Sequence, residues 1–393
     1  MRSVTVVGAS LAGSSTIRAL REQGFDGRIT AIGAETHLPY DRPPLSKEFL
    51  AGSMSADELS LLSGEDEQSL RVDWLLGRTA TALDPSTMAV VLDDGQRIVS
   101  DAVVLATGAR ARQLPGPRPA GVHTVRTLED ATALRAELRP GARVVLIGGG
   151  FIGAEIASTA AQLGAGVTIV EAVATPLAVQ LGDEVASACT ALHADNGVTL
   201  LTGVGVAELV SHEDGALDAV RAVRLTDGRE LPADVVVVGI GAIPNTEWLA
   251  GSGLAVDGGI ITDAGCATDI PGIVAVGDCA SSYRHFTGAT LRLEHWTNAV
   301  KQPAAAAATL LGLPAPKPDV PYFWSDQHGS RLQFAGHRTA GAEVEITEGS
   351  AEERSFLAVY RSAGEPVAVF ALNRPKPFNR LRRELATRAT AHA

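Results

Sequence analysis

Glycines recur at a regular spacing in the middle of the chain, in the stretch IGGGFIGAEIA. An apolar run with the length of a buried strand precedes them, and a helical segment and a second apolar strand follow. In this context the spacing G-x-G-x-x-G allows a tight turn, lets the backbone approach a diphosphate and packs the helix against the strand. The free N–H groups at the helix start then bind phosphate oxygens. The predicted loop and helix start consist of Gly148, Gly150, Phe151, Ile152 and Gly153.

An acidic residue closes the second strand of this unit. Glu171 is placed to accept hydrogen bonds from the ribose hydroxyls of an adenosine and to repel a 2′-phosphate. Residues 172–180 contain no Arg or Lys, so the stretch predicts NADH rather than NADPH. The alternative, a glycine-rich turn without a ligand, is disfavoured because strand, loop, helix and acid occur in the required order.

A second motif of the same kind stands near the start of the chain. A buried strand at residues 2–7 leads into GASLAG and a helical pattern. Ser10 replaces the middle glycine, so a diphosphate must approach past a hydroxymethyl group. Glu35, after the next strand at residues 28–32, is the nearby acid that can reach a ribose. The predicted loop and helix start are Gly8, Ser10, Leu11, Ala12 and Gly13.

Two such motifs in one chain imply two bound nucleotides. A flavin and a nicotinamide cofactor that exchange a hydride are the simplest account. A duplicated unit with one inactive site is the alternative that Ser10 leaves open.

Bulk composition excludes several other classes of protein. The net charge of −12 disfavours nucleic-acid binding. The three cysteines show no C-x-x-C spacing, which fits a reducing cytoplasm and predicts no metal site. We recognise no export signal, membrane span or lipid anchor in the sequence.

The segment LPYDRPPLSKEFL, residues 38–50, contains Lys47 in a conformationally restricted loop, because its prolines hold the backbone extended. Ser46 is expected to cap the helix that begins at Lys47. Together with the two fingerprints, IVAVGDCA at residues 273–280 and LEHWTNAVKQ at residues 293–302, this segment resembles one family. It is that of the FAD-dependent, NADH-oxidising ferredoxin reductases that serve bacterial haem-thiolate monooxygenases and Rieske-type dioxygenases.

The resemblance covers nearly the whole chain and implies roles for single residues. Lys47 is expected beside the flavin N5, paired with Glu155; a surface lysine is the alternative. Asp278 is expected to bind the ribityl chain of FAD, unless it is a plain N-cap. Trp296 is expected near the isoalloxazine ring, with core packing as the competing role. The other residues assigned to the flavin site are Arg42, Thr107, Gly108 and Arg110, of which Arg110 can equally be a solvated hinge residue, and Gly241 is expected to flank the nicotinamide.

At 393 residues, with 46% apolar and 20% charged residues, the chain is expected to form two or three α/β domains. The resemblance implies a glutathione-reductase-like fold, in which the FAD domain is interrupted by the NADH domain. We expect the FAD domain at residues 1–111 and 232–312 and the NADH domain at residues 112–231. Four prolines within residues 313–321 mark a boundary, and short strands with turns after it predict an antiparallel α+β domain with a terminal helix at residues 313–393.

The predicted reaction depends on the absence of cysteine from residues 36–50. Flavin disulfide reductases of this architecture carry a redox cysteine pair after the first fingerprint and NADH oxidases carry one cysteine, but residues 36–50 contain none. Electrons are therefore expected to pass from NADH to FAD and then singly to an acidic [2Fe–2S] ferredoxin that feeds an oxygenase. We expect a cytoplasmic monomer. The alternatives are a rubredoxin reductase, an NADH oxidase and an interaction protein like apoptosis-inducing factor.

The C-terminal segment is basic although the whole protein is acidic. Such a cluster is either a solvated helix face or a docking patch that steers an acidic partner. Against one acid, Glu384, it contains Arg374, Lys376, Arg380, Arg382, Arg383 and Arg388.

Overall fold

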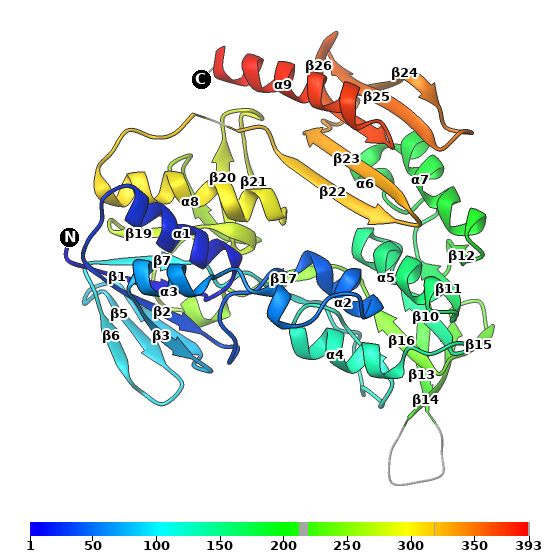
Figure 1. The fold of residues 1–393 in the computed structure, drawn as a ribbon, viewed down its shortest axis with the longest axis horizontal. Helices are drawn as coiled ribbons and strands as arrows, with labels where there is room; N and C mark the ends of the chain where they lie inside the picture. Colours follow the sequence, from blue (N-terminus) through cyan, green and yellow to red (C-terminus); the bar gives the residue numbers. More distant parts are fainter. Residues whose placement is uncertain (212–218, 318, 392–393) are drawn as a thin grey trace.

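The computed structural model describes residues 1–211, 219–317 and 319–391. Two parallel five-stranded sheets and one antiparallel five-stranded sheet form the body of the molecule (Figure 1). The predicted fold class, two Rossmann-like units followed by a C-terminal α+β unit, is confirmed. Within the described ranges, no helix combines the length and apolarity needed to cross a membrane.

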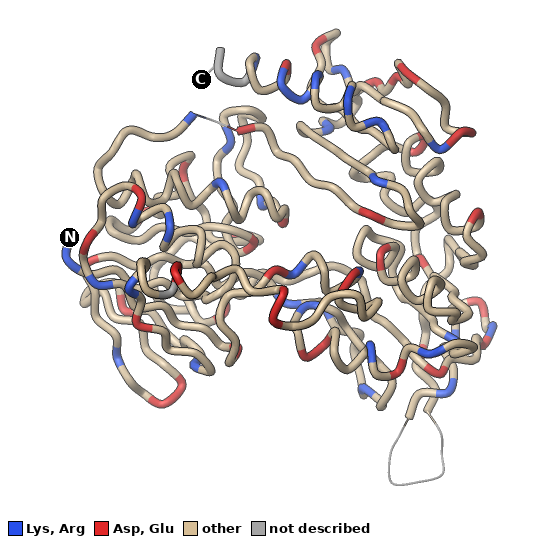
Figure 2. The backbone as a smooth tube through the Cα atoms, viewed as in Figure 1, with Lys and Arg blue, Asp and Glu red and all other residues tan. Residues whose placement is uncertain are grey.

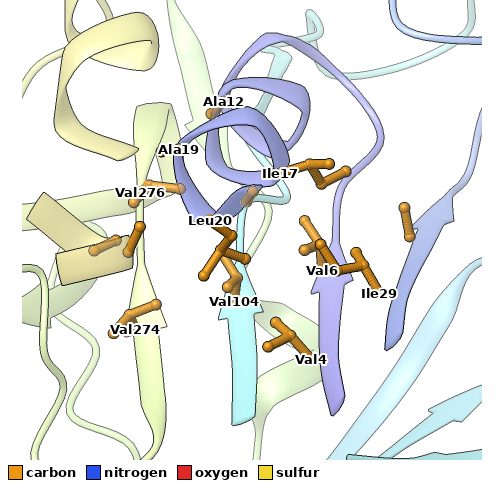
Figure 3. Close-up of a cluster of buried hydrophobic side chains, with 14 of the residues drawn as sticks. Val4, Val6, Ala12, Ile17, Ala19, Leu20, Ile29, Val104, Val274 and Val276 are labelled. Carbon is orange, nitrogen blue, oxygen red and sulfur yellow. The ribbon is translucent and has the colours of Figure 1, made fainter. Parts of the chain in front are cut away.

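The first parallel sheet has the strand order β19-β7-β1-β2-β3. Helix α1 (Leu11–Glu22) covers one face of it next to α8 (Trp296–Leu311). Figure 3 shows Ile17 and Leu20 of α1 directed onto Val6 and Val104 of the strands, and all four side chains are fully buried. The strands are β1 (Ser3–Val7), β2 (Arg28–Gly33), β3 (Val72–Leu76), β7 (Ala102–Leu105) and β19 (Ile273–Ala275).

One expected strand of this sheet is divided. The sequence predicts a single strand over residues 97–106, but β6 (Arg97–Val99) ends before β7 begins. Between them the Ser100 hydroxyl donates to the Ala102 carbonyl at 2.7 Å, and β6 pairs in a separate antiparallel sheet with β5 (Ala89–Leu92) and β4 (Ala80–Asp84).

The second parallel sheet has the order β12-β11-β10-β16-β9. The expected end of the inserted segment at residue 231 is wrong, because β16 pairs with β10 inside this sheet. The chain returns to the first unit only after β16, through an antiparallel pair of β8 (Ala109–Ala111) and β17 (Ala242–Pro244). The strands are β9 (Val122–His123), β10 (Arg143–Ile147), β11 (Gly166–Glu171), β12 (Thr199–Thr202) and β16 (Val235–Val238).

The C-terminal sheet has the order β22-β23-β26-β25-β24 and is antiparallel throughout, as predicted. Phe378 of helix α9 (Pro375–Ala391) packs on one face, and Val185 and Leu192 of α7 (Asp183–Asp195) pack on the other. The second nucleotide unit and the C-terminal unit therefore share a core. The strands are β22 (Tyr322–Gln327), β23 (Ser330–Gly336), β24 (Glu343–Ser350), β25 (Ser355–Ser362) and β26 (Glu365–Leu372).

The remaining elements connect these three sheets. The other helices are α2 (Glu48–Ala51), α3 (Gly64–Leu70), α4 (Leu128–Glu137), α5 (Phe151–Gln162) and α6 (Ala178–Leu181), with 3₁₀ turns η1 (Pro43–Ser46), η2 (Asp57–Leu59), η3 (Glu247–Leu249) and η4 (Gly277–Cys279). The small sheets consist of β13 (Val206–Ser211), β14 (Val220–Leu225) and β15 (Glu230–Pro232), and of β18 (Ile260–Thr262), β20 (Ala280–Arg284) and β21 (Ala289–Arg292).

Candidate functional site

The first fingerprint loop, residues 8–13, joins β1 to α1 and is shaped by two glycines. Gly8 has a φ of +121°, and a Cβ added to it would lie 2.0 Å from the Ala106 carbonyl oxygen. A Cβ on Gly13 would lie 1.9 Å from the Gly8 carbonyl oxygen. Both positions therefore exclude any side chain. Ser10 has an extended backbone, with φ −125° and ψ −160°, so its side chain causes no strain.

A hydrogen-bonded group lies beside this loop. The Arg42 Nε donates to the Ser10 Oγ at 3.3 Å, and its Nη2 lies 2.6 Å from the Glu35 Oε1. The Tyr40 hydroxyl donates to the other oxygen of Glu35, and it accepts from Arg42 Nη1 at 3.0 Å. Three residues that were predicted from the sequence, Ser10, Glu35 and Arg42, are thus joined by hydrogen bonds. Tyr40 belongs to the same group but was not predicted.

The start of α1 meets the turn that contains Asp278. Leu11 and Ala12 form the first turn of α1, and a Cβ added to Gly277 would lie 2.8 Å from the Ala12 Cβ. Asp278 accepts from Arg126 Nη2 at 2.7 Å. Arg126 was missed because it belongs to none of the motifs; only the fold brings it to this aspartate, from the connection before α4.

The second fingerprint loop, residues 148–153, joins β10 to α5. A Cβ on Gly148 would lie 2.3 Å from the Gly239 carbonyl oxygen, and one on Gly153 would lie 2.4 Å from that of Gly148. Gly150 differs, because its φ is −74° and a Cβ there would meet no protein atom within 4 Å. Neither backbone conformation nor packing explains this glycine, whereas the approach of a ligand does.

Glu171 ends β11 next to this loop, as predicted. Its Oε2 accepts from the Gly149 N–H at 2.8 Å, and its Oε1 accepts from the Val173 N–H at 3.1 Å. At the start of α5, the Phe151 ring packs 4.8 Å from the Phe323 ring, while Ile152 is 50% exposed.

Lys47 and Glu155 form an ion pair, with the Nζ 2.8 Å from the Oε2 and side-chain exposures of 14% and 4%. Glu155 has three more donors within the protein. The Ser46 hydroxyl lies 2.6 Å from the same oxygen, while the Ser325 hydroxyl at 2.8 Å and the Asp326 N–H at 3.3 Å reach Oε1. The expected capping role of Ser46 is wrong, because α2 has no side-chain cap and the hydroxyl serves Glu155 instead.

Three chain segments that are far apart in the sequence therefore meet at one buried carboxylate. Lys47 comes from the connection before α2, Glu155 from α5 and Ser325 from β22. A buried ion pair costs desolvation energy unless further hydrogen bonds satisfy its atoms. The additional donors meet that requirement for Glu155.

Trp296 opens α8 and faces aromatic neighbours. Its Nε1 donates to the Asp41 carboxylate at 2.7 Å, and its ring lies 5.6 Å from the Trp324 ring, edge to face. Burial raises the pKa of Asp41. Tyr322 stacks on Trp324 at 6.0 Å, so a line of rings runs from Trp296 toward α9, where Arg382 lies 3.9 Å above the Tyr322 ring.

His295, which precedes Trp296, has a buried Nδ1 without a hydrogen-bond partner within the described residues. Burial lowers the pKa of this imidazole to about 4. Buried polar atoms are normally paired. The unpaired Nδ1 of His295, next to Trp296 in the chain, could therefore serve a bound group, and this residue fits a flavin site.

The connection between the two units contains the remaining predicted residues. The Thr107 hydroxyl donates to the Asn245 carbonyl at 2.7 Å, and the Asn245 side-chain amide donates to the Thr107 carbonyl at 2.9 Å. Gly108 and Gly241 have φ values of +64° and +103°. The half-exposed Arg110 pairs with Glu247, so we place it in the connection rather than with the residues around Asp278.

All three cysteines are buried. Burial raises the pKa of the Cys189 and Cys266 thiols to about 12 and also raises that of Cys279. Thiols of this kind are unreactive, because the thiolate is the nucleophile. In the part of the chain that the structure describes, no cluster of His, Cys, Asp or Glu is suited to a metal ion.

The two parallel sheets, each with a fingerprint loop at the carboxyl end of its central strand, define the class of oxidoreductases built from two dinucleotide-binding units. Residues 2–303 match the model of the family described as pyridine nucleotide-disulphide oxidoreductase, and residues 322–393 match that described as reductase C-terminal. The chain belongs to the pyridine nucleotide-disulphide oxidoreductases and, among them, to the ferredoxin reductases.

Its relatives include ferredoxin reductase components of dioxygenase systems and putidaredoxin reductase. The chain is 39% identical to the ferredoxin reductase component of chlorobenzene dioxygenase from Cupriavidus sp. (strain PS12), covering 98% of this chain and 93% of the relative. It is 36% identical to putidaredoxin reductase of Pseudomonas putida, over 98% and 92% of the two chains. The solved covalent putidaredoxin reductase–putidaredoxin complex matches with a TM-score of 0.95 and 35% identity, over 98% and 93% of the chains.

Proposed function

We propose that this protein takes a hydride from NADH onto FAD and passes single electrons to an acidic [2Fe–2S] ferredoxin, which feeds a haem-thiolate monooxygenase or a Rieske dioxygenase. The observation that carries the proposal is the buried Lys47–Glu155 pair, which joins the segment before α2 to the helix that follows the second fingerprint loop, in a chain whose cysteines are all buried. We further propose that the protein is a cytoplasmic monomer.

We assign FAD to the first fingerprint loop. The start of α1 has no side-chain cap, which leaves its N–H groups for a diphosphate. Glu35 would hold a ribose and Asp278 the ribityl chain, with Trp296 beside the ring. A bound flavin accepts two electrons at once and releases them one at a time, which is the chemistry that joins NADH to an iron–sulfur partner.

We assign NADH to the second loop. The open side of Gly150 would admit the diphosphate, and Glu171 would hold the adenosine ribose and repel a 2′-phosphate. Lys47 would present its ammonium to the flavin ring, where negative charge develops during reduction, and Glu155 would hold that ammonium in place.

We propose that the exposed basic side of α9 receives the ferredoxin. Basic residues follow one another along this helix in Figure 2. Arg380 and Arg388 pair with Glu348 and Glu365, whereas Lys376 and Arg383 are exposed. The line of rings from Tyr322 to Trp296 begins beneath this helix, so a partner bound here would lie at one end of it.

An anaerobic two-step titration tests the proposal. NADH should bleach the flavin absorption, and an added [2Fe–2S] ferredoxin should restore it with two ferredoxins reduced for each NADH. Flavin that only oxygen reoxidises would contradict the ferredoxin assignment and favour the oxidase alternative. A chain without bound flavin would contradict every redox assignment.

A charge reversal tests the docking face separately. Arg383→Glu should raise the ferredoxin concentration needed for half-maximal rate, with a smaller effect at high salt because screening weakens exposed charge pairs. Helix α4 lies on the opposite side of the molecule from α9 (Figure 1). Arg139 is an exposed residue shortly after the end of α4, so Arg139→Glu is the control and should leave that concentration unchanged. Equal effects of the two variants would show that α9 is not the docking face.

A further inference from the structure

Ser10 stands where the fingerprint has a glycine, and its side chain is used in an unusual way. A serine at a helix N-cap normally accepts a hydrogen bond from an N–H group of the first turn. Ser10 is the N-cap of α1 but makes no such bond. Its hydroxyl instead accepts from Arg42 Nε at 3.3 Å. The N–H groups of the first turn therefore stay available to an anion although a capping residue is present.

Arg42 is held from several directions at once. Its Nη2 pairs with Glu35 at 2.6 Å, and its Nη1 donates to the Tyr40 hydroxyl at 3.0 Å and to the Arg126 carbonyl at 2.5 Å. The bond to Ser10 is the one that ties this guanidinium to the fingerprint loop. Since a guanidinium has five N–H groups and these bonds use four, one N–H remains for a further acceptor.

We propose that Ser10 is a positioning residue, whose hydroxyl holds Arg42 at the first fingerprint loop so that the guanidinium binds the diphosphate of FAD. The inference rests on the proposed assignment of FAD to this loop. In this arrangement a cation replaces the close backbone contact that a middle glycine provides. Hydrogen bonds from a charged donor to phosphate are roughly twice as strong as neutral ones, so the replacement retains affinity.

The second loop shows the opposite arrangement. Its middle glycine, Gly150, is present and unobstructed, and the group that bonds to the loop backbone is the carboxylate of Glu171. The two loops therefore differ in the group that bonds to them, which is the guanidinium of Arg42, itself paired with Glu35, at the first loop and the carboxylate of Glu171 at the second. A cation suits a cofactor that stays bound through many turnovers, whereas an open loop beside a carboxylate suits a nucleotide that must leave after each hydride transfer.

Measuring FAD binding to the flavin-free protein tests the proposal without depending on turnover. Ser10→Ala should raise the dissociation constant of FAD on the order of ten- to a hundredfold, as expected for loss of one hydrogen bond to a charged group. Ser10→Thr, which keeps the hydroxyl, should remain close to the wild type. In an Arg42→Gln background, Ser10→Ala should have no further effect, because the hydroxyl acts through the arginine.

Two controls separate this role from a structural one. Ser14→Ala removes another hydroxyl of α1, which donates to the Leu11 carbonyl at 3.1 Å, and should leave FAD affinity unchanged. NADH binding to the second loop should be unaltered in every Ser10 variant. Ser10→Ala that binds FAD as tightly as the wild type, or additive effects of Ser10→Ala and Arg42→Gln, would overturn the inference while leaving the proposed function intact. A wild type that binds no FAD would contradict the proposed function itself.

Discussion

Replacing Lys47 and replacing Glu155 by alanine should destabilise the protein by different amounts. In Lys47→Ala, Glu155 keeps the hydroxyls of Ser46 and Ser325 and the Asp326 N–H. In Glu155→Ala, the Lys47 ammonium loses the one ion-pair partner that it has among the described residues. The buried Ser325 hydroxyl also loses its carboxylate acceptor, and Ser46 keeps only the longer bond to the Pro43 carbonyl at 3.3 Å. We therefore expect Glu155→Ala to be the more destabilising change.

The expected losses in the free energy of unfolding follow from the burial of the Lys47–Glu155 pair. Loss of one hydrogen bond to a charged group, as in Lys47→Ala, costs about 2 kcal/mol. Removal of one member of a buried pair that leaves the other uncompensated costs about 3–5 kcal/mol, and this describes Glu155→Ala. Lys301→Ala is the matched control, because Lys301 pairs with Asp319 at 2.6 Å but both side chains are nearly half exposed. Exposed pairs contribute about 0–1 kcal/mol.

Thermal unfolding of the flavin-loaded proteins, followed by circular dichroism and by flavin fluorescence, measures the order of stability. We expect wild type and Lys301→Ala to be nearly equal, Lys47→Ala to be lower and Glu155→Ala to be lowest. Reduction of the flavin by NADH should be slower in both variants of the pair. Equal losses in Lys47→Ala and Glu155→Ala, or a loss in Lys301→Ala as large as that in Lys47→Ala, would refute the reasoning.

Three further predictions use other parts of the site. Glu171→Arg should relax or reverse the preference for NADH over NADPH, and an unchanged ratio of kcat/KM values would show that Glu171 does not contact the ribose. Gly150→Ala should leave the melting temperature unchanged and weaken NADH binding. Gly153→Ala should unfold the second nucleotide-binding unit, because the added Cβ would lie 2.4 Å from the Gly148 carbonyl oxygen. Equal melting temperatures of the two variants would contradict this prediction. Burial lowers the pKa of His193 to about 4, so the unfolded chain binds a proton before the folded one does, and stability should fall as pH decreases from about 6.5 to 4. His193→Gln should flatten that fall, and an unchanged pH dependence of unfolding would exclude this origin.

The elements that local sequence determines were predicted well. The apolar runs expected as strands at residues 2–7, 144–147 and 167–170 correspond to β1, β10 and β11 within a residue or two, because a strand buried on both faces leaves a continuous apolar signal. The terminal domain followed from alternating strands with turns. The single strand expected over residues 97–106 was wrong, since both halves are apolar and the turn at Ser100 and Asp101 carries no Gly or Pro.

The site was predictable where one motif contains the residue and its partner. Glu171 beside Gly149 is fixed by the geometry of one strand–loop–helix–strand unit. Arg126, Ser325 and Tyr40 escaped notice because their roles depend on contacts between segments far apart in the sequence. Ser46 was assigned a local capping role, but a buried carboxylate more than a hundred residues away binds its hydroxyl instead. Tertiary partners of this kind leave no periodic signal in a single sequence.

The central claim, that electrons leave this protein for an iron–sulfur partner, is tested most directly by NADH-driven cytochrome c reduction with and without an acidic [2Fe–2S] ferredoxin, while oxygen uptake is followed in the same buffer. The account predicts that cytochrome c reduction depends strongly on ferredoxin and that oxygen consumption stays slow. Rapid oxygen consumption that is indifferent to ferredoxin would contradict it.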